Sequence, residues 1–287
     1  MIRGSMPAFC IGALGGSGTR MVAELFLRVG VFMGYQRNIA NDCLDFTQLV
    51  NMADIDTIPA QLQLFVRYMN TRARPVSDRI RLWRQFIQRY QRTLPQQATR
   101  DAAWRWHMRD FLKEQTGIID KTPSQYWGWK EPNTHIILPH IMMHFPQTQY
   151  IHIIRHGLDM AFSQNHNQLA RWGWIYGIPY SVDLSDTTRA MRQLDYWIIT
   201  TRRIMQLADY YPGRIKIFQL EAFWQEPVPT IRSCFAHAGI PITDAQLADV
   251  VTIPQNKHGD YRYRQHDISI FRPDQLEAVQ ALGYSIT

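Results

Sequence analysis

A glycine-rich segment is the first place in the sequence where residue types and spacing predict chemistry. This glycine loop runs from Gly12 to Thr19 and reads GALGGSGT. Glycines leave backbone N–H groups uncovered, and several such groups at the start of a helix bind an anion such as phosphate. An apolar strand pattern over residues 7–12 precedes the loop, and an apolar helix pattern from Met21 to Val29 follows it. Strand, glycine loop and helix together predict the opening of a nucleotide-binding α/β fold.

The loop lacks the lysine that ATPases and many kinases carry. Their motif, GxxxxGK[ST], places a lysine directly after its second glycine, where it reaches the β- and γ-phosphates of ATP. In this chain Gly18 is followed by Thr19 and Arg20. The sequence therefore disfavours a standard ATP site. A loop of this kind still allows one such function, a nucleotide-dependent, kinase-like phosphotransferase on a degenerate phosphate loop.

The glycine spacing also fits a family of oxidoreductases. Gly12, Gly16 and Gly18 match the GxxxGxG pattern of short-chain dehydrogenases, and Tyr126 and Lys130 form a YxxxK sequence. That YxxxK belongs on a helix, whereas the glycine and proline around Lys130 oppose a helix there. A dehydrogenase is therefore disfavoured.

The charge of the chain suits an anionic ligand. The 287 residues carry a formal net charge of +7, and of the 31 lysine and arginine residues only five are lysines. The planar fork of arginine binds phosphate and sulfate in bidentate fashion. The alternative interpretation is a generally basic surface with non-specific affinity for nucleic acid.

An arginine and a serine lie at the end of a predicted strand and in the helix pattern after it. Arg155 ends an isoleucine-rich strand pattern over residues 149–155, and Ser163 follows eight residues later in a helix pattern over residues 158–170. An arginine that leaves the carboxyl end of a parallel strand lies at the edge where open α/β sheets bind ligands. We expect Arg155 and Ser163 to converge there.

The remaining pattern supplies the elements that must position these residues. It predicts helices over residues 133–145 and 187–211 and a strand over residues 214–220. Strands separated by helices imply a parallel sheet with helices on both faces, so the fold class is α/β with a P-loop-like sheet. Residues 37–125 have a different composition and predict a helical insertion or cap. We expect one domain over residues 6–287, because residues 1–5 resemble an expression remnant.

The glycine loop resembles the first motif of sulfotransferases that use 3'-phosphoadenosine 5'-phosphosulfate (PAPS). That motif is a strand, then roughly G-x-P-[RK]-S-G-T-T, then a helix. Residues 13–20 read ALGGSGTR, so the Ser-Gly-Thr core is kept. Gly15 and Gly16 stand where the motif has its proline and its basic residue, and Arg20 replaces the last threonine.

Three further segments resemble the same family in the same order. The segment WKEP at residues 129–132 is similar to the family's K-x-P segment. Residues 150–163 are similar to its strand-turn-helix, in which the arginine and the serine hold the 3'-phosphate. Residues 257–262, KHGDYR, are similar to its late basic loop, which also reaches the 3'-phosphate.

The resemblance implies a PAPS-dependent sulfotransferase that needs no metal. The residues expected to bind PAPS are Gly15, Gly16, Ser17, Gly18, Thr19, Arg20, Arg155, Ser163, Lys257, Gly259 and Arg262.

Catalysis requires a cation beside the departing 5'-phosphate. In the family the basic residue of the loop supplies it, and Gly16 has taken that place here. We expect Lys130 to replace it, because the corresponding lysine of relatives lies near the sulfate. Arg20 is the second candidate.

The acceptor hydroxyl needs a general base. The candidates are Asp42, Asp45, Glu131 and His107. We prefer Asp42, which follows the glycine loop at a distance where some relatives carry their base. The alternative role for Asp42 is that of a turn residue, because Asn-Asp is a common turn pair.

The acceptor of the sulfuryl group is expected to be a small molecule, a saccharide or a lipid. We expect the helical insertion over residues 37–125 to bind it. Flat aromatic faces beside hydrogen-bond donors suit a sugar or glycolipid, and the sequence offers Trp83, Trp104, Trp106, Trp127, Trp129, Trp172 and Trp174. Three widely spaced cysteines predict a reducing compartment, the cytoplasm. No membrane span, metal site or nucleic-acid partner is expected.

Overall fold

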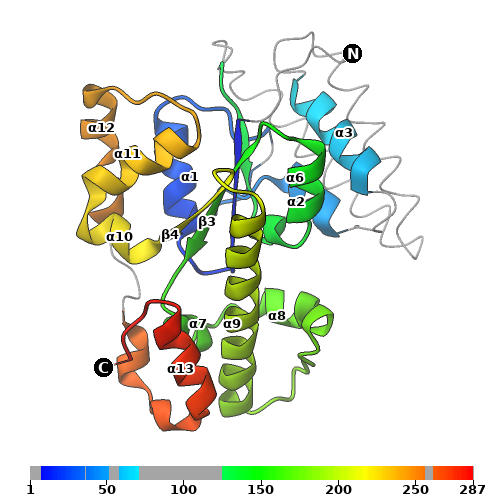
Figure 1. The fold of residues 1–287 in the computed structure, drawn as a ribbon, viewed down its shortest axis with the longest axis vertical. Coiled ribbons are helices and arrows are strands. Elements are labelled where there is room, and N and C mark those ends of the chain that lie inside the picture. The colour runs from blue at the N-terminus through cyan, green and yellow to red at the C-terminus, as the bar shows by residue number, and fades with distance from the viewer. Residues whose placement is uncertain (1–7, 36, 52–57, 71–124, 256–260, 287) are drawn as a thin grey trace.

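A computed structural model describes residues 8–35, 37–51, 58–70, 125–255 and 261–286. A parallel four-stranded sheet carries helices on both faces (Figure 1), which confirms the predicted α/β class. The strands are β1 (Phe9–Ala13), β2 (Gly128–Lys130), β3 (Gln149–Ile154) and β4 (Ile215–Gln219).

The strand order places a ligand crevice at the end of β1. The order is β2-β1-β3-β4, so β2 lies on one side of β1 and β3 lies on the other. Ile11 pairs with Lys130 of β2, and Ala13 pairs with Ile153 of β3. Open α/β sheets bind ligands beyond the carboxyl ends of their strands at such a switch in order.

The helices form three groups around the sheet (Figure 1). One face is covered by α1 (Thr19–Arg28), α10 (Leu220–Gln225), α11 (Pro227–His237) and α12 (Asp244–Val250). The other is covered by α2 (Leu44–Asn51), α3 (Ile58–Met69) and α6 (Leu138–His144). Beyond the carboxyl ends of the strands lie α7 (Gly157–Ala161), α8 (Asn167–Trp172), the beginning of the long α9 (Asp186–Tyr210) and α13 (Pro273–Ala281). Towards its end α9 runs beside the sheet, where Ile204 packs in the core on the face covered by α2, α3 and α6. The short 3-10 helices are η3 (Pro132–His135), η4 (Gly173–Tyr176), η5 (Ile253–Gln255), η6 (Arg262–Gln265) and η7 (Ile268–Ile270).

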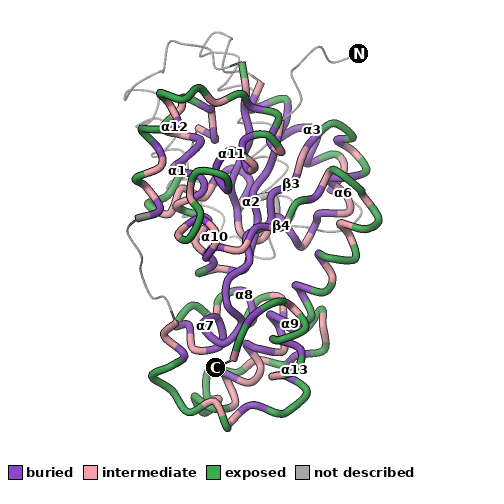
Figure 2. Tube along the Cα trace, turned by 60° about the vertical axis from the view of Figure 1, so that its left-hand side comes forward, coloured by how far each residue is buried: buried purple, intermediate pink, exposed green. Residues whose placement is uncertain are grey.

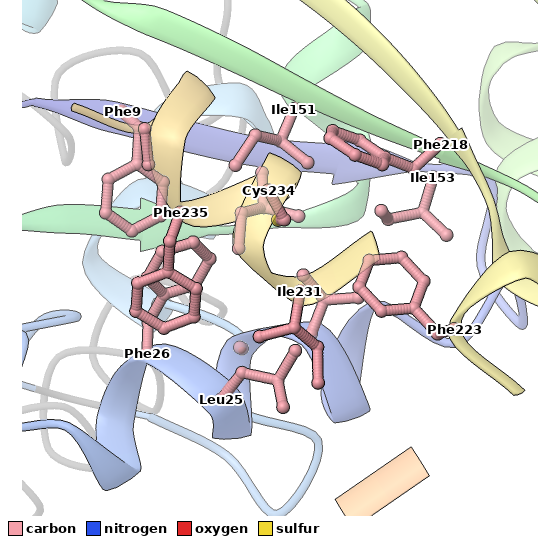
Figure 3. Close-up of a cluster of buried hydrophobic side chains, with 14 of the residues drawn as sticks. Phe9, Leu25, Phe26, Ile151, Ile153, Phe218, Phe223, Ile231, Cys234 and Phe235 are labelled. Atoms are coloured by element: carbon pink, nitrogen blue, oxygen red, sulfur yellow. The ribbon is translucent and has the colours of Figure 1, made fainter. Parts of the chain in front are cut away.

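Alternate residues of the strands supply two cores. Phe9, Ile11 and Ala13 of β1 face α1 and α11, while Cys10 faces the opposite core. Figure 3 shows the first core, in which Phe26 of α1 lies between strand and helix residues. Its ring centroid is 4.3 Å from that of Phe9 and 4.4 Å from that of Phe235. Because helices cover both faces of the sheet, the central strands β1 and β3 are buried at every position except Gln149 (Figure 2).

Two predicted helices are each divided in the structure. The pattern over residues 158–170 forms α7 and α8, with Ser163 in the turn between them rather than in a helix. There the Asn165 N–H donates to Ser163 Oγ at 3.2 Å, and the Asn167 N–H donates to Asn165 Oδ1 at 3.3 Å. Such side chains compete with helical hydrogen bonds, so they end one helix and start the next.

The pattern over residues 133–145 forms η3 and α6, each with a proline near its start. Proline favours the first turn of a helix and opposes its interior, which explains the break between them. By contrast, the predicted elements around β3, α9 and β4 are confirmed within two residues at each end. Of the expected insertion over residues 37–125, the structure describes α2 and α3, and residues 71–124 lie outside the described part.

Among the described residues the three cysteines are buried and form no disulfide. No helix in the described ranges combines the length and the apolar character that a membrane crossing requires.

Two histidines are buried, and their burial is expected to lower the free energy of unfolding in acid. Burial lowers the pKa of His152 to about 3, and burial together with the charge of His152 lowers that of His135. In the unfolded chain both titrate near about 6.5, so below that pH the unfolded state binds more protons. Their contribution to folding is therefore complete above that pH and is lost as the pH falls towards about 3.

We expect the free energy of unfolding of His152→Gln to depend less on pH than that of the parent. Between pH 6 and pH 4 the difference in slope should be about 1.4 kcal/mol per pH unit. Urea unfolding at several pH values measures it. Equal slopes for parent and variant would show that His152 binds its proton equally well in both states.

Candidate active site

The predicted site residues gather at the carboxyl ends of three adjacent strands. The glycine loop follows β1, Lys130 ends β2, and Arg155 follows β3. Since these strands are parallel and adjacent, their ends share one edge of the sheet (Figure 1). The fold thus brings together residues that are more than 130 positions apart.

The glycine loop presents open amides at the start of α1. Gly16 and Gly18 adopt positive φ angles of 99° and 81°, which favour glycine. The Ser17 N–H is used within the loop, where it donates to Leu14 O at 3.1 Å. In the described part of the chain, the amides of Gly16, Gly18, Thr19 and Arg20 have no acceptor. No acidic residue occupies the first turn of α1, so an anion is favoured there.

Gly18 has a packing role besides its backbone role. A Cβ atom at this position would collide with the side chain of Leu220. Larger residues at position 18 would therefore disturb the core below the loop as well as the amides. Substitution of Gly18 cannot separate anion binding from folding.

Arg155 is fixed beside the glycine loop by a buried ion pair. It is 3% exposed, and its Nη2 lies 2.7 Å from Oδ2 of Asp159, which is 1% exposed. Its Nε also donates to Asp159 at 3.2 Å, and Nη1 donates to Gly16 O at 3.4 Å. Three of the five donors of the guanidinium are thus occupied, which leaves two for a ligand.

Ser163 and Arg262 also approach this region. A Cβ atom on Gly16 would lie 3.4 Å from Ser163 Oγ, so the hydroxyl borders the glycine loop. The Tyr263 N–H donates to Oδ1 of Asp159 at 3.1 Å, which ties η6 to the ion pair. Burial lowers the pKa of Arg262, and the nearby charge of Arg155 lowers it further. The structure therefore brings Arg155, Ser163 and Arg262 together, whereas Lys257 and Gly259 lie outside the described residues.

Lys130 and Asp42, which were both expected in catalysis, form an ion pair. Lys130 Nζ bonds to Oδ1 of Asp42 and donates to Ala40 O at 3.0 Å. Oδ2 of Asp42 accepts from Asn38 Nδ2 at 2.7 Å. The Lys130 side chain is 2% exposed and that of Asp42 is 19% exposed, so solvent reaches the pair from the side of Asp42.

The electrostatic surroundings of Lys130 are mixed. Burial lowers the pKa of Lys130, the Asp42 carboxylate opposes this shift, and the charge of Arg20 adds to it. Arg20 itself is exposed in the first turn of α1. Besides Arg155, the site therefore holds a buried cation, Lys130, and a cation that faces solvent, Arg20.

Glu131 is buried next to Lys130. Burial raises its pKa to about 7, against the hydrogen bond that Asn133 Nδ2 donates to Oε1 at 2.8 Å. Its Oε2 has no partner among the described residues. Of the other candidate bases, Asp45 is buried on the α2 side of the sheet, and His107 lies outside the described residues.

Sequence reasoning did not single out Asp159, Asn133 or Gln168. Asp159 had a signal, because it lies four residues after Arg155 and such pairs meet on a helix. The amide side chains had none: apart from the bond of Asn133 to Glu131, their partners are backbone and side-chain atoms far away in the sequence.

The arrangement can hold a ligand with two anionic groups. Open amides at a helix start suit one group, and the free donors of Arg155 with Ser163 suit a second. The described residues contain no group of three or more His, Cys, Asp or Glu side chains arranged for a metal ion. The donors present thus suit a ligand that carries two anionic groups.

Comparisons with known proteins concern the family and the fold of this chain. A model described as the sulfotransferase family matches residues 7–244. The sulfotransferase domain from the curacin biosynthetic pathway is similar in structure, with a TM-score of 0.50 and 10% identity, over 98% of this chain and 99% of that chain. This likeness concerns the fold.

Two other solved structures are similar over almost the whole chain. The sulfotransferase domain of the olefin synthase from Synechococcus PCC 7002 has 12% identity and a TM-score of 0.48, over 99% of this chain and 97% of that one. Mouse sulfotransferase SULT7A1, solved with PAP, has 11% identity and a TM-score of 0.45, over 96% of this chain and 82% of that one. No curated protein matches the sequence.

Proposed function

We propose, from the premise that this chain belongs to the sulfotransferase family, that it transfers a sulfuryl group from PAPS to an acceptor hydroxyl. The observation that carries the proposal is the convergence of the open loop amides with Arg155 and Lys130 at one edge of the sheet. PAPS is an adenosine nucleotide with a 3'-phosphate and an activated sulfate on its 5'-phosphate. Its two anionic ends correspond to the two donor groups of this site.

The residues divide between the two ends of the nucleotide. The amides of Gly16, Gly18, Thr19 and Arg20 would hold the 5'-phosphosulfate at the start of α1. Arg155, Ser163 and the basic segment that holds Lys257, Gly259 and Arg262 would hold the 3'-phosphate. Ser17 and Gly15 complete the loop that presents the amides.

Lys130 and Asp42 would act on the reacting groups. Asp42, the more exposed partner, takes the proton of the acceptor hydroxyl as its oxygen bonds to sulfur. Lys130 stabilises the electron pair left on the bridging oxygen of the 5'-phosphate as its bond to sulfur breaks. Arg20 supplies further positive charge from the open side of the site.

For the acceptor we favour a saccharide or glycolipid hydroxyl. Trp127 and Trp129 are core residues, so they do not serve as a sugar platform. Trp174 is 72% exposed, and Arg171 stacks over the ring of Trp172 at 5.0 Å. This exposed aromatic surface after α8 supports the proposal. Because the three thiols are free, we place the enzyme in the cytoplasm.

Calorimetry with two nucleotides tests the donor. In EDTA, adenosine 3',5'-bisphosphate should bind on the order of 10²-fold more tightly than 5'-AMP, because only the former offers a 3'-phosphate to Arg155. Equal affinities would contradict the donor assignment. Binding of ATP only with Mg²⁺ would instead favour the kinase-like alternative, and steep salt dependence without preference for the 3'-phosphate would favour a nucleic-acid surface.

A further inference from the structure

A buried glutamine forms two hydrogen bonds with the backbone of the glycine loop. Gln168, the second residue of α8, is 7% exposed. Its Oε1 accepts a hydrogen bond from the Gly15 N–H at 3.1 Å, and its Nε2 donates to Ala13 O at 3.2 Å. One side-chain amide thus pairs with a donor and an acceptor two residues apart, as the edge of a neighbouring strand would.

Gln168 is itself held in one orientation. Its Nε2 also donates to Asn133 Oδ1 at 3.0 Å, and that oxygen accepts a second bond from Trp172 Nε1 at 3.1 Å. The amide nitrogen of Asn133 donates to Glu131 Oε1 at 2.8 Å. These bonds connect the glycine loop to the end of β2 and to the next turn of α8. Because the oxygen and the nitrogen of both side-chain amides, Gln168 and Asn133, are hydrogen-bonded, the network fixes the orientation of each amide.

The glycine loop needs such support. Consecutive glycines such as Gly15 and Gly16 have the largest backbone freedom to lose on ordering. The motif that the loop resembles has proline in place of Gly15. Proline fixes φ and has no N–H, so it needs no partner. With glycine, the loop gains backbone freedom and a half-buried N–H donor. The hydrogen bonds of Gln168 restrict that freedom and pair that donor.

We propose that Gln168 is a positioning residue that holds the glycine loop in its anion-binding conformation. The Gly15 amide is consequently not a ligand donor in this chain, and the open loop amides that face the anion are those of Gly16, Gly18, Thr19 and Arg20. The identity of that anion rests on the proposed function, but the ordering of the loop does not.

The variant Gln168→Met tests the proposal, because methionine keeps the volume and removes all three hydrogen bonds. We expect adenosine 3',5'-bisphosphate to bind at least about tenfold more weakly. Without nucleotide, the Gly15 amide should exchange with solvent at least about tenfold faster, as measured by NMR. Amides in β3 should keep their exchange rates.

Gln275→Met is the matched control. Gln275 is also buried, accepts from the Arg272 N–H at 3.1 Å, and donates to Met191 O and Asp195, but it lies on α13 away from the loop. The variant Gln275→Met should have lower thermal stability than the parent and the same nucleotide affinity. If Gln168→Met and Gln275→Met affect affinity equally, or if the Gly15 amide stays protected in Gln168→Met, the positioning role is wrong.

A second variant provides a test if Gln168→Met does not fold. The measurements also separate the positioning role of Gln168 from the proposed sulfotransferase function. Gln168→Glu keeps the acceptor for the Gly15 N–H but cannot donate to Ala13 O or Asn133, so Gly15 should remain protected while affinity still falls. Faster exchange at Gly15 in this variant would overturn the proposal. If the parent protein does not bind the bisphosphate, the proposed function fails, and the exchange experiment still decides the role of Gln168.

Discussion

Replacing Lys130 with methionine is expected to lower kcat by about 10²–10³-fold while the affinity for adenosine 3',5'-bisphosphate changes little. The bisphosphate lacks the sulfate, so its binding does not depend on a cation at the transferred group. Since the acceptor is not identified, slow hydrolysis of PAPS by water serves as the reaction. Methionine preserves the buried stem, and Asp42 keeps its bond from Asn38 and its contact with solvent. The variant should therefore fold.

Lys216→Met is the control for this experiment. Lys216 also belongs to a strand of the sheet, but it is exposed, and its Nζ donates to Ser233 Oγ at 2.7 Å. It should hydrolyse PAPS at the rate of the parent. If instead Lys130→Met raises KM for PAPS with an unchanged kcat, Lys130 stabilises the ground state and the transition state alike. In that case Arg20 becomes the candidate for the leaving-group cation.

The sequence predicts local features of this site well, because they depend on neighbouring residues. The strand, glycine loop and helix around Gly16 follow from apolar periodicity and from glycines at the turn. Arg155 was placed correctly because a strand pattern ends there. Lys130 was singled out by the resemblance of WKEP to the K-x-P segment, since β2 has only three residues and gives little strand pattern of its own.

Contacts between distant segments could not be predicted from one sequence. Lys130 and Asp42 were each expected near the reaction, but nothing in the sequence pairs residues 88 positions apart. Gln168 resembles any other polar residue on a short helix until the fold brings it to the glycine loop. The turn at Ser163 was missed for a related reason, since apolar periodicity continues through it while side-chain hydrogen bonds break the helix.

The buried pair of Arg155 and Asp159 leads to the largest expected effect on stability. Arg155→Ala would leave the carboxylate of Asp159 buried, and among the described residues the Tyr263 N–H would be its one remaining hydrogen-bond donor. An uncompensated buried charge of this kind costs about 3–5 kcal/mol. Urea unfolding should show that loss. A loss below about 1 kcal/mol would mean that water or another cation reaches Asp159.

Because of that loss, the role of Arg155 in binding is better tested with Arg155→Lys. Lysine keeps the charge beside Asp159 but lacks the planar fork that can bind Asp159 and a phosphate together. We expect binding of adenosine 3',5'-bisphosphate to weaken by about 10–10²-fold, the equivalent of one charge-assisted hydrogen bond of about 1.5–3 kcal/mol. Binding of 5'-AMP should change less than about threefold, since it has no 3'-phosphate.

Arg214→Lys provides the comparison that makes this result specific. Arg214 also uses its fork within the protein, where it donates to Met142 O at 2.8 Å and Phe145 O at 2.6 Å. It directly precedes β4, at the opposite end of the strands from the glycine loop, so its replacement should change stability and neither affinity. If Arg155→Lys weakens both nucleotides equally, its guanidinium acts through Gly16 O on the loop amides, and the 3'-phosphate belongs to other residues. Selective loss of the bisphosphate would identify Arg155 as the residue that distinguishes a PAPS-type nucleotide from AMP.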